Sequence, residues 1–405
     1  MAIARHQGDY MGALEGFRVL DLGLLVQGPQ AALTLGDMGA DVIKIELPMM
    51  GDQGRWLPSS LDDPRPPWFI GCNRGKRSVT IDLRTPQGAE AFLKLVETSD
   101  VVISNFKPGT LDEWGIGYEQ AAERNPRIVY GMGSTLGPQG PAATREGADL
   151  AGQAAGGLIS TTGVEGGEPT PVGATIADHM GAQNMTAGIL AALLSRERTG
   201  EGQKVEVSLF GSVIYAQASE YTAYFLTGEV PGPANYGHPV INAAYGILRT
   251  QDGYMALVGV PPANREAFYA AVEMPELADD DRFQPLLYTA EVKRELFELL
   301  QPRFLTRTTA DWSERLGAAG CRFAPVNDYA QAAEDPHAWD NGYLQMVEHP
   351  EYGAIRMIGS PITMSGTPVE PGQIAPELGM NTEEVLLELG YDWDQIGELR
   401  DSGAI

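Results

Sequence analysis

The sequence predicts an α/β protein whose first half forms a doubly wound, mostly parallel sheet. Short β-rich runs alternate there with helical segments, which is typical of βαβ units. The 49 glycines and 28 prolines among 405 residues favour the many tight connections of such a fold. Hydrophobic residues make up 43% and charged residues 20% of the chain, so it can bury a sizeable core and is not disordered throughout.

The first βαβ unit occupies the N-terminal region. Phe17–Leu22 and Asp41–Glu46 are β-rich runs, and Gln30–Met38 between them is compact and rich in alanine and leucine. Gly39 follows the predicted helix, where glycine readily adopts the left-handed conformation of a C-terminal cap. We expect strand, helix and strand in this order, joined by the usual right-handed crossover.

The same pattern continues after residue 77. Ser78–Leu83 is strand-like, and Thr85 followed by Pro86 is typical of a helix N-cap and first helical position. Apolar residues between Ala91 and Val96 fall at helical spacing. Two further predicted strands are Asp100–Asn105 and Arg127–Gly131.

The second half of the chain has a different organisation. Asp178–Arg198 predicts a long helix, Lys204–Phe210 an alternating strand, and Tyr221–Tyr245 irregular structure rich in aromatic residues, glycine and proline. The stretch that follows predicts a second, smaller domain. The remaining predicted elements are the strands Tyr254–Val260 and Phe323–Asn327 and the helices Arg265–Ala271, Glu291–Leu300, Asn381–Leu389 and Asp394–Ser402.

The net charge of −26 bears on possible partners. A chain this acidic repels nucleic acid and anionic membranes, so we expect neither as a partner. Cys72 and Cys321 are too few for a disulfide scaffold or a CxxC zinc site. Met1–Tyr10 has no apolar signal-peptide core, and the strongly apolar stretch Ala187–Leu194 is shorter than the ~20 residues of a membrane span. We therefore expect a cytoplasmic protein.

Common catalytic and cofactor motifs are absent from the sequence. No GxGxxG opens a helix after the first strand, which disfavours a dinucleotide site. There is no HExxH metal motif, the five histidines are scattered, and no metal site is predicted. No GxSxG nucleophile elbow occurs. Gly71–Ser78 resembles a P-loop, but its glycines are one residue too close together.

A local basic cluster stands out in this acidic chain. Arg74, Lys76 and Arg77 lie within four residues, and Arg84 and Lys107 follow further along. These cations could hold a phosphate-bearing ligand through charge-assisted hydrogen bonds. They could equally belong to a solvated turn whose charges pair with nearby carboxylates.

Asp178 and Asp149 are the candidate catalytic carboxylates. Asp178 lies at or near the start of the long predicted helix, where it could cap the helix or act as a nucleophile. The same two interpretations apply to Asp149. A nucleophilic carboxylate would need nearby amide donors to stabilise the anions formed beside it.

Ordered blocks along nearly the whole chain resemble the class III CoA-transferase family, which includes formyl-CoA transferase and carnitine CoA-transferase. The matching blocks are Leu14–Asp21, Gly39–Glu46, Asn73–Leu83, Asn105–Gly109, Asn125–Arg127, Arg198–Gln203, Ala324–Asn327 and Leu389–Tyr391.

The resemblance implies that Asp178, in the segment Gly173–Gly181, is the catalytic residue. It would attack an acyl-CoA thioester to form an acyl-aspartyl anhydride, and CoA thiolate would convert this into an aspartyl-CoA thioester. No tightly bound cofactor is implied, because CoA and acyl-CoA are substrates. The residues expected to bind CoA are Val26, Gln27, Ile81, Asp82, Leu83, Arg84, Asn105, Phe106 and Lys107, together with Lys76 and Arg77 of the basic cluster. The family pattern often has arginine at the position of Leu47 and near Glu113, and this chain departs from it there.

The resemblance also implies a domain organisation and an assembly. A Rossmann-like large domain would be formed by residues 1–220 and 326–405, and a smaller α/β domain by residues 221–325. Two chains would form an interlocked homodimer.

The acid substrates are expected to contact the region Tyr221–Tyr245, with Tyr236 and His238 as polar contacts. The glycine-rich loop of formyl-CoA transferases is missing between Tyr236 and Gly253, which disfavours formate and oxalate. The spacing of Tyr245-Gly-Ile-Leu and Asp252-Gly-Tyr is closer to the carnitine-type branch.

Two alternatives to CoA transfer stay open at this point. The α-methylacyl-CoA racemases share the fold and carry a histidine directly before the position of Asp149, where this chain has Ala148. A racemase needs a second base for proton transfer at Cα. The other alternative is a CoA-binding protein without catalytic activity.

Overall fold

The computed structural model describes residues 12–285, 287–372 and 374–405, and the chain divides into two compact units. Unit 1 comprises Met1–Gly156, Gly173–Ala216 and Pro336–Ile405, and unit 2 comprises Gly157–Val172 and Gln217–Asp335. The boundaries expected from the sequence were 220/221 and 325/326. Those of the structure are 216/217 and 335/336, and residues 157–172 lie with unit 2. The N-terminal stretch Met1–Tyr10 lies outside the described residues.

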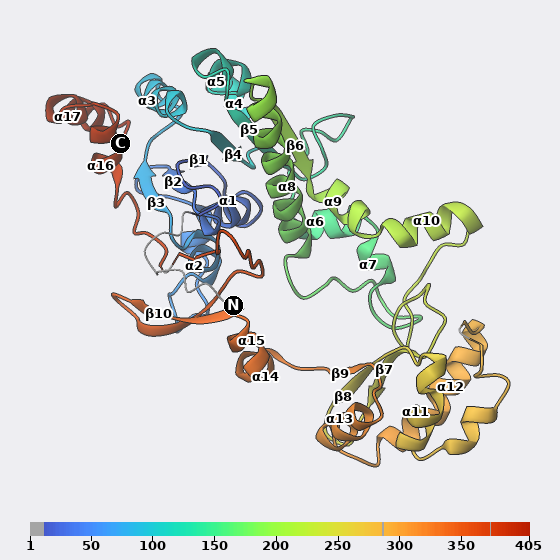
Figure 1. Ribbon diagram of the computed structural model, residues 1–405. Helices are drawn as coiled ribbons and strands as arrows, with labels where there is room; N and C mark the ends of the chain where they lie inside the picture. The colour runs from blue at the N-terminus through green and yellow to red at the C-terminus, as the bar shows by residue number, and fades with distance from the viewer. Residues whose placement is uncertain (1–11, 286, 373) are drawn as a thin grey trace. The chain divides into compact units, whose positions relative to one another are not determined.

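Unit 1 is built on a six-stranded parallel sheet in the order β3-β2-β1-β4-β5-β6 (Figure 1). The connections reverse direction between β1 and β4, so the sheet is doubly wound as the sequence predicts. Leu20 of β1 pairs with Ile43 of β2 on one side and Val102 of β4 on the other. The strands are β1 (Arg18–Asp21), β2 (Asp41–Glu46), β3 (Arg77–Thr80), β4 (Val101–Ser104), β5 (Val129–Ser134) and β6 (Lys204–Ser208).

Helices cover both faces of this sheet, because its strands alternate apolar side chains toward both sides. On one face, strand residues such as Val42 and Val129 pack with α1 (Gln27–Asp37) and α8 (Ile176–Thr199). On the other face, Leu20 and Tyr130 pack with α3 (Pro86–Glu97), α5 (Tyr118–Arg124) and α16 (Thr382–Glu388). Unit 1 also contains the antiparallel pair β10 (Leu344–His349) and β11 (Gly353–Ile358), and η1 (Gln53–Trp56), α2 (Pro67–Asn73), α4 (Thr110–Glu113), α6 (Asp149–Ala155), α9 (Leu209–Ala216), α15 (Pro336–Asp340) and α17 (Trp393–Asp401).

Unit 2 has its own antiparallel sheet and its own core. The sheet order is β7-β8-β9, and helices bury Trp312 completely, with its indole N–H donating to the Phe304 carbonyl oxygen at 2.8 Å. The elements are β7 (Tyr245–Arg249), β8 (Tyr254–Val258), β9 (Phe323–Pro325), α7 (Leu158–Thr161), α10 (Ala218–Thr227), η2 (Pro262–Asn264), α11 (Arg265–Ala271), η3 (Pro275–Asp279), α12 (Ala290–Phe304), α13 (Thr309–Ala318) and α14 (Tyr329–Glu334).

Local sequence signals explain several boundaries. Thr85 caps α3 by accepting a hydrogen bond from the Gly88 amide at 3.0 Å, and Gly39 follows α1 with φ +106°. In two segments, the structure has a helix where the sequence predicts another structure. The strand from Lys204 ends at Ser208, because the chain turns into α9 there, and residues expected to be irregular continue α10 to Thr227. The described helices include none with the length and apolarity needed to cross a bilayer.

Candidate active site

Asp178 lies in the first turn of α8 and does not cap the helix. The cap is Asp149, whose Oδ1 accepts hydrogen bonds from the amides of Ala177 at 2.7 Å and Asp178 at 3.3 Å. Gln153, one turn later on α6, donates to Asp149 Oδ2 at 2.6 Å. Among the described residues, nothing donates a hydrogen bond to the Asp178 carboxylate. The structure thus gives the two aspartates different tasks and leaves the Asp178 oxygens available for reaction.

The surroundings of Asp178 favour a protonatable carboxyl group. Burial raises its pKa to about 7, and the negative charge of Asp149 adds to the effect. His179 is also partly buried, and desolvation lowers its pKa. A carboxyl with its pKa near neutrality can change its charge during a reaction, which is common at catalytic sites.

Gln27 lies beside the same helix. Its side-chain amide occupies space that only glycine leaves open, because a Cβ on Gly181 would lie 2.6 Å from Gln27 Nε2 and a Cβ on Gly133 would lie 2.3 Å from Oε1. Asp178 and Gly181 are three residues apart on α8 and share a face. Gln27 is buried, and no described residue accepts a hydrogen bond from its Nε2. This N–H donor can therefore serve an oxygen atom of a bound substrate.

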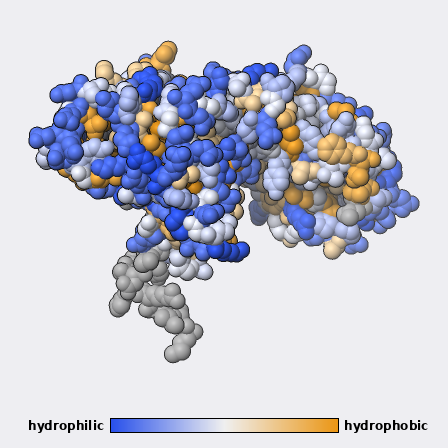
Figure 2. Space-filling view, turned by 90° about the horizontal axis from the view of Figure 1, so that it is seen from above, coloured by the Kyte–Doolittle hydropathy of each residue, from blue (hydrophilic) through white to orange (hydrophobic). Residues whose placement is uncertain are grey.

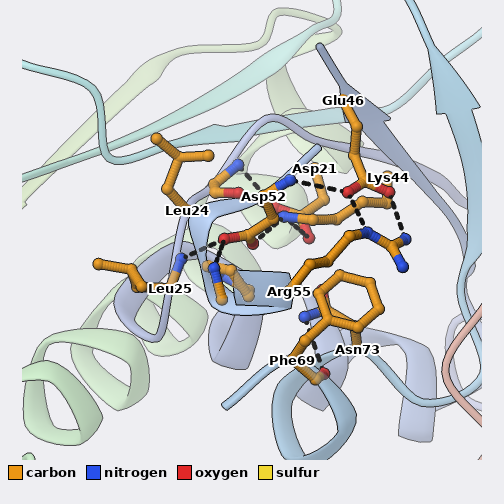
Figure 3. A network of polar contacts seen from close by, with 12 residues as sticks. Asp21, Leu24, Leu25, Lys44, Glu46, Asp52, Arg55, Phe69 and Asn73 are labelled. Carbon is orange, nitrogen blue, oxygen red and sulfur yellow. Dashed lines mark hydrogen bonds and ion pairs between the residues drawn. The ribbon is translucent and has the colours of Figure 1, made fainter. Parts of the chain in front are cut away.

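A buried ionic network holds the turn that precedes Gln27 (Figure 3). Asp52 accepts a hydrogen bond from the Leu25 amide at 2.9 Å and pairs with Lys44 at 2.9 Å. Asn105 brackets the backbone of Leu24, accepting from its amide at 2.7 Å and donating to its carbonyl at 2.9 Å. Leu25 has φ +62°, a conformation that costs a residue with a side chain about 1 kcal/mol. The network stabilises this turn and so positions Val26 and Gln27.

A cavity of about 310 Å³ lies at the carboxyl ends of the strands of unit 1. Ligands of open α/β sheets bind at this edge. Five of the residues predicted to bind CoA line it. Its aromatic wall includes Phe106 and Trp114, whose rings meet edge to face with centroids 5.3 Å apart. The five predicted residues are Ile81, Asp82, Leu83, Arg84 and Phe106.

The cations of the basic cluster have different partners. Lys76 is buried and donates to Asp21 at 2.7 Å and to two further oxygens, so all three of its donors are used within the core. Arg77 pairs with Asp41 and Glu388. Both residues thus have partners within the protein, and their contact with CoA stays a prediction. Arg84 is exposed and forms a two-point pair with Asp82, while Lys107 is exposed and pairs with no described carboxylate.

Sequence reasoning missed Glu46 and Asp52. Arg55 binds the buried Glu46 carboxylate at two points, each 2.8 Å, and the Asp52 amide donates to the same carboxylate at 2.9 Å. The signal that could have found Asp52 is the Asp-Gln-Gly spacing, because an aspartate often accepts from the amide two residues later. In the sequence, Glu46 is indistinguishable from any polar residue at the end of a strand. No cluster of three potential metal ligands occurs in the part of the chain that the structure describes.

Unit 2 contains a second cavity, of about 360 Å³. It is lined by Tyr236 and His238, the two residues expected to contact the acid substrate, and by Lys293 of α12. His238 Nε2 lies 2.8 Å from a Glu220 carboxylate oxygen, and its Nδ1 accepts a hydrogen bond from the Val240 amide.

Comparison with known proteins identifies the family to which the chain belongs. The model of "CoA-transferase family III" matches residues 14–382. The succinyl-CoA:mesaconate CoA-transferase of Haloarcula hispanica is 36% identical over 399 residues, which cover 94% of this chain and 97% of that protein. The succinyl-CoA:glutarate CoA-transferase of Homo sapiens is 30% identical over 397 residues, covering 97% and 90%. The crystal structure of a CaiB/BaiF family protein from Brucella suis superposes with a TM-score of 0.83 at 31% identity, covering 94% of this chain and all of that one.

Proposed function

The chain belongs to CoA-transferase family III and transfers CoA from an acyl-CoA to a carboxylic acid, and we propose that Asp178 is the carboxylate that carries the exchange. The observation that supports this role is the partially buried Asp178 carboxylate, which has no described hydrogen-bond donor because Asp149 caps the helix in its place. The Nε2 donor of Gln27 lies beside the same face of α8.

The proposed reaction keeps one activated acyl bond at every stage, either a thioester or an anhydride. An Asp178 oxygen attacks the acyl carbonyl and the C–S bond breaks. CoA departs as the thiolate, and an acyl-aspartyl anhydride remains. The thiolate then attacks the aspartyl carbonyl and releases the donor acid, leaving an aspartyl-CoA thioester. The acceptor carboxylate displaces the thiolate, which finally attacks the acceptor's acyl carbon and frees Asp178. An amide donor such as Gln27 can stabilise the oxyanion formed at each step.

We propose that CoA binds at the cavity of unit 1, with its nucleotide near Phe106 and its phosphates near Arg84 and Lys107. The apolar and aromatic walls fit a purine ring. Phosphate fits two exposed cations: Arg84, which lines the cavity, and Lys107, which directly follows the lining residue Phe106. We propose dicarboxylic acids as substrates, because the two relatives compared above are named for succinyl-CoA with mesaconate or glutarate.

We also propose that the protein acts as a homodimer. The face shown in Figure 2 is largely hydrophilic with separate hydrophobic groups, and α10 and the residues after it expose Phe225, Leu226 and Val230. Large apolar side chains that are exposed close together are typical of surfaces that contact another chain. Native mass spectrometry that finds a stable folded monomer would contradict this part. The cytoplasmic location stays a prediction from the sequence.

CoA transfer is favoured over racemisation and over CoA binding without catalysis. A racemase would need a base at Ala148, and a methyl group cannot accept a proton. A binding protein without activity does not fit a chain that matches a transferase family over residues 14–382.

The test of Asp178 is chemical trapping. Incubation with succinyl-CoA followed by hydroxylamine is expected to leave a hydroxamate on the peptide that contains Asp178, found by mass spectrometry. Asp178→Ala is expected to abolish transfer from succinyl-CoA to glutarate while CoA binding changes less than threefold. Transfer retained by Asp178→Ala would remove this residue from its proposed role.

A further inference from the structure

The buried lysines of the two units differ in how their charges are balanced. In unit 1, Lys44 pairs with Asp52 at 2.9 Å and Lys76 with Asp21 at 2.7 Å. In unit 2, Lys293 is only 7% exposed and donates to two backbone carbonyl oxygens, Ile241 at 2.8 Å and His238 at 3.3 Å. No described carboxylate forms an ion pair with it. Burial of a lysine without a counter-ion is rare, because the charge loses its hydration.

Lys293 lines the cavity of about 360 Å³ that lies within unit 2. An ammonium group has three N–H donors, and the described carbonyl partners account for two of them. Burial lowers the pKa of Lys293, and no carboxylate acts in the opposite direction. Lys293 therefore contributes to the cavity wall one N–H donor without a described partner and one positive charge without a described carboxylate partner.

The other charged groups of the cavity are hydrogen-bonded, ion-paired or exposed. Glu220 is bound to the His238 imidazole at 2.8 Å. Glu165 and Arg294 face each other at 3.7 Å with more than half of each side chain exposed, and Glu229 is exposed too. Water and salt screen exposed charges, whereas the buried charge of Lys293 acts at closer to full strength. An anion in the cavity is thus drawn toward Lys293.

We propose that the cavity of unit 2 is a carboxylate-binding site in which Lys293 is the counter-ion and hydrogen-bond donor for a small organic acid. A carboxylate fits because it is compact, singly charged and able to accept from the ammonium group. This binding is independent of the role proposed for Asp178, so direct measurement tests it even if that role is wrong.

The test is calorimetric titration of the full-length protein with glutarate, using the neutral diamide glutaramide as the uncharged probe. Wild-type protein is expected to bind glutarate and not glutaramide. Lys293→Met is expected to weaken glutarate binding about 10-fold to 100-fold, as for the loss of a charged hydrogen bond. Lys293→Arg, which keeps the charge, is expected to retain most of the affinity.

Arg294→Met is the matched control, because it removes one cation from the same helix at an exposed position. It is expected to change glutarate affinity less than threefold. Equal affinity of wild type and Lys293→Met would overturn the proposal and leave Lys293 as a tether for the loop carrying His238 and Ile241. Equal weakening by Lys293→Met and Arg294→Met would also overturn it, because the effect would then come from net charge.

A measurement on the wild-type chain covers the case in which Lys293→Met fails to fold. Limited acetylation with acetic anhydride, followed by peptide mass spectrometry, reports how accessible each lysine is. Glutarate is expected to slow acetylation of Lys293 at least threefold while Lys94 reacts at an unchanged rate. Unchanged acetylation of Lys293 at saturating glutarate would contradict the site.

Kinetic measurements distinguish whether the bound acid is a substrate or a separate effector. If the bound carboxylate is a substrate, Lys293→Met raises the KM for glutarate in the transfer assay. If it is a separate effector, Lys293→Met loses glutarate binding without a change in that KM. Both results support the site, and they differ in what occupies it.

Discussion

At the residue scale, the site depends on a division of labour between two aspartates. Asp149 satisfies the amides at the start of α8, which any helix leaves without partners, so Asp178 can keep its carboxylate unbonded. The proximity of the two negative charges then contributes to the raised pKa of Asp178. A cap supplied by another helix thus has an electrostatic consequence for the proposed nucleophile, Asp178.

This arrangement predicts how activity depends on pH. The neutral carboxyl is a poor nucleophile, so kcat/KM for the acyl-CoA is expected to rise with pH through a limb near pH 7, where Asp178 ionises. Asp149→Asn removes the like charge and keeps an acceptor for the helix amides. It is expected to move the limb to lower pH, but not to the ordinary value of an aspartate, because burial is the larger cause.

The measurement is a pH profile of kcat/KM for both proteins at constant ionic strength. Glu113→Gln, an exposed change in the same unit, serves as the control and is expected to leave the limb in place. A limb that stays at the same pH in Asp149→Asn would show that Asp149 does not influence the titrating group.

Lys107 and Arg84 predict different effects on CoA binding. Lys107 has no described carboxylate partner, so Lys107→Ala is expected to weaken CoA binding by about 1–3 kcal/mol if it holds a phosphate. Arg84 must first leave its pair with Asp82, so Arg84→Ala is expected to have the smaller effect. Calorimetry at two salt concentrations checks both, and an unchanged dissociation constant in Lys107→Ala would refute that contact.

The sequence could show which residue types stand near the site but not which of them are already paired. Lys76 and Arg77 are adjacent to each other in a basic cluster, yet the acceptors that occupy them include Asp21 and Glu388, 55 and 311 positions away. Long-range pairing of this kind leaves no trace in local spacing. Local spacing also cannot decide whether Asp178 caps α8, because the cap comes from Asp149, 29 positions earlier.

At the element scale, the turn between β1 and α1 is the segment whose geometry depends most on distant partners. Its backbone is held by Asp52 and Asn105, and Leu25 adopts a left-handed conformation. The sequence predicted the strand before it and most of the helix after it from local patterns. It could not predict the turn, because no glycine marks the strained position.

Asp52→Ala is therefore expected to cost about 3 kcal/mol of unfolding free energy, because Lys44 is left buried with its pairing reduced to the longer contact with Asp21. The variant is also expected to bind acyl-CoA more weakly, since the turn positions Gln27. Denaturant unfolding and CoA titration measure the two effects. Asp63→Ala, which removes an exposed partner of Arg65 nearby, is the control and is expected to change neither.

At the scale of the whole molecule, each unit has a core of its own, and the core of unit 1 is assembled from both ends of the chain. Val385 of α16 packs in the cluster that contains Val79 and Phe92, about 300 positions earlier. The Asn381 amide donates to the Ser78 carbonyl at 2.8 Å and Thr382 bonds to Thr80 of the edge strand β3. The C-terminal segment is thus part of the large unit, whereas Leu316 belongs to the separate core of unit 2.

Two truncations test whether these cores are energetically distinct. Val385→Ala is expected to cost about 2 kcal/mol through lost burial and a cavity, and Leu316→Ala about 3 kcal/mol. In native-state hydrogen exchange, Val385→Ala should speed exchange of amides in β1, β2 and β3 and leave β7 and β8 unchanged, while Leu316→Ala should do the reverse. Opening events are confined to a cooperative unit when its contacts are internal. If both variants accelerate the same amides, the two units unfold as one, and the separation of their cores does not extend to their stability.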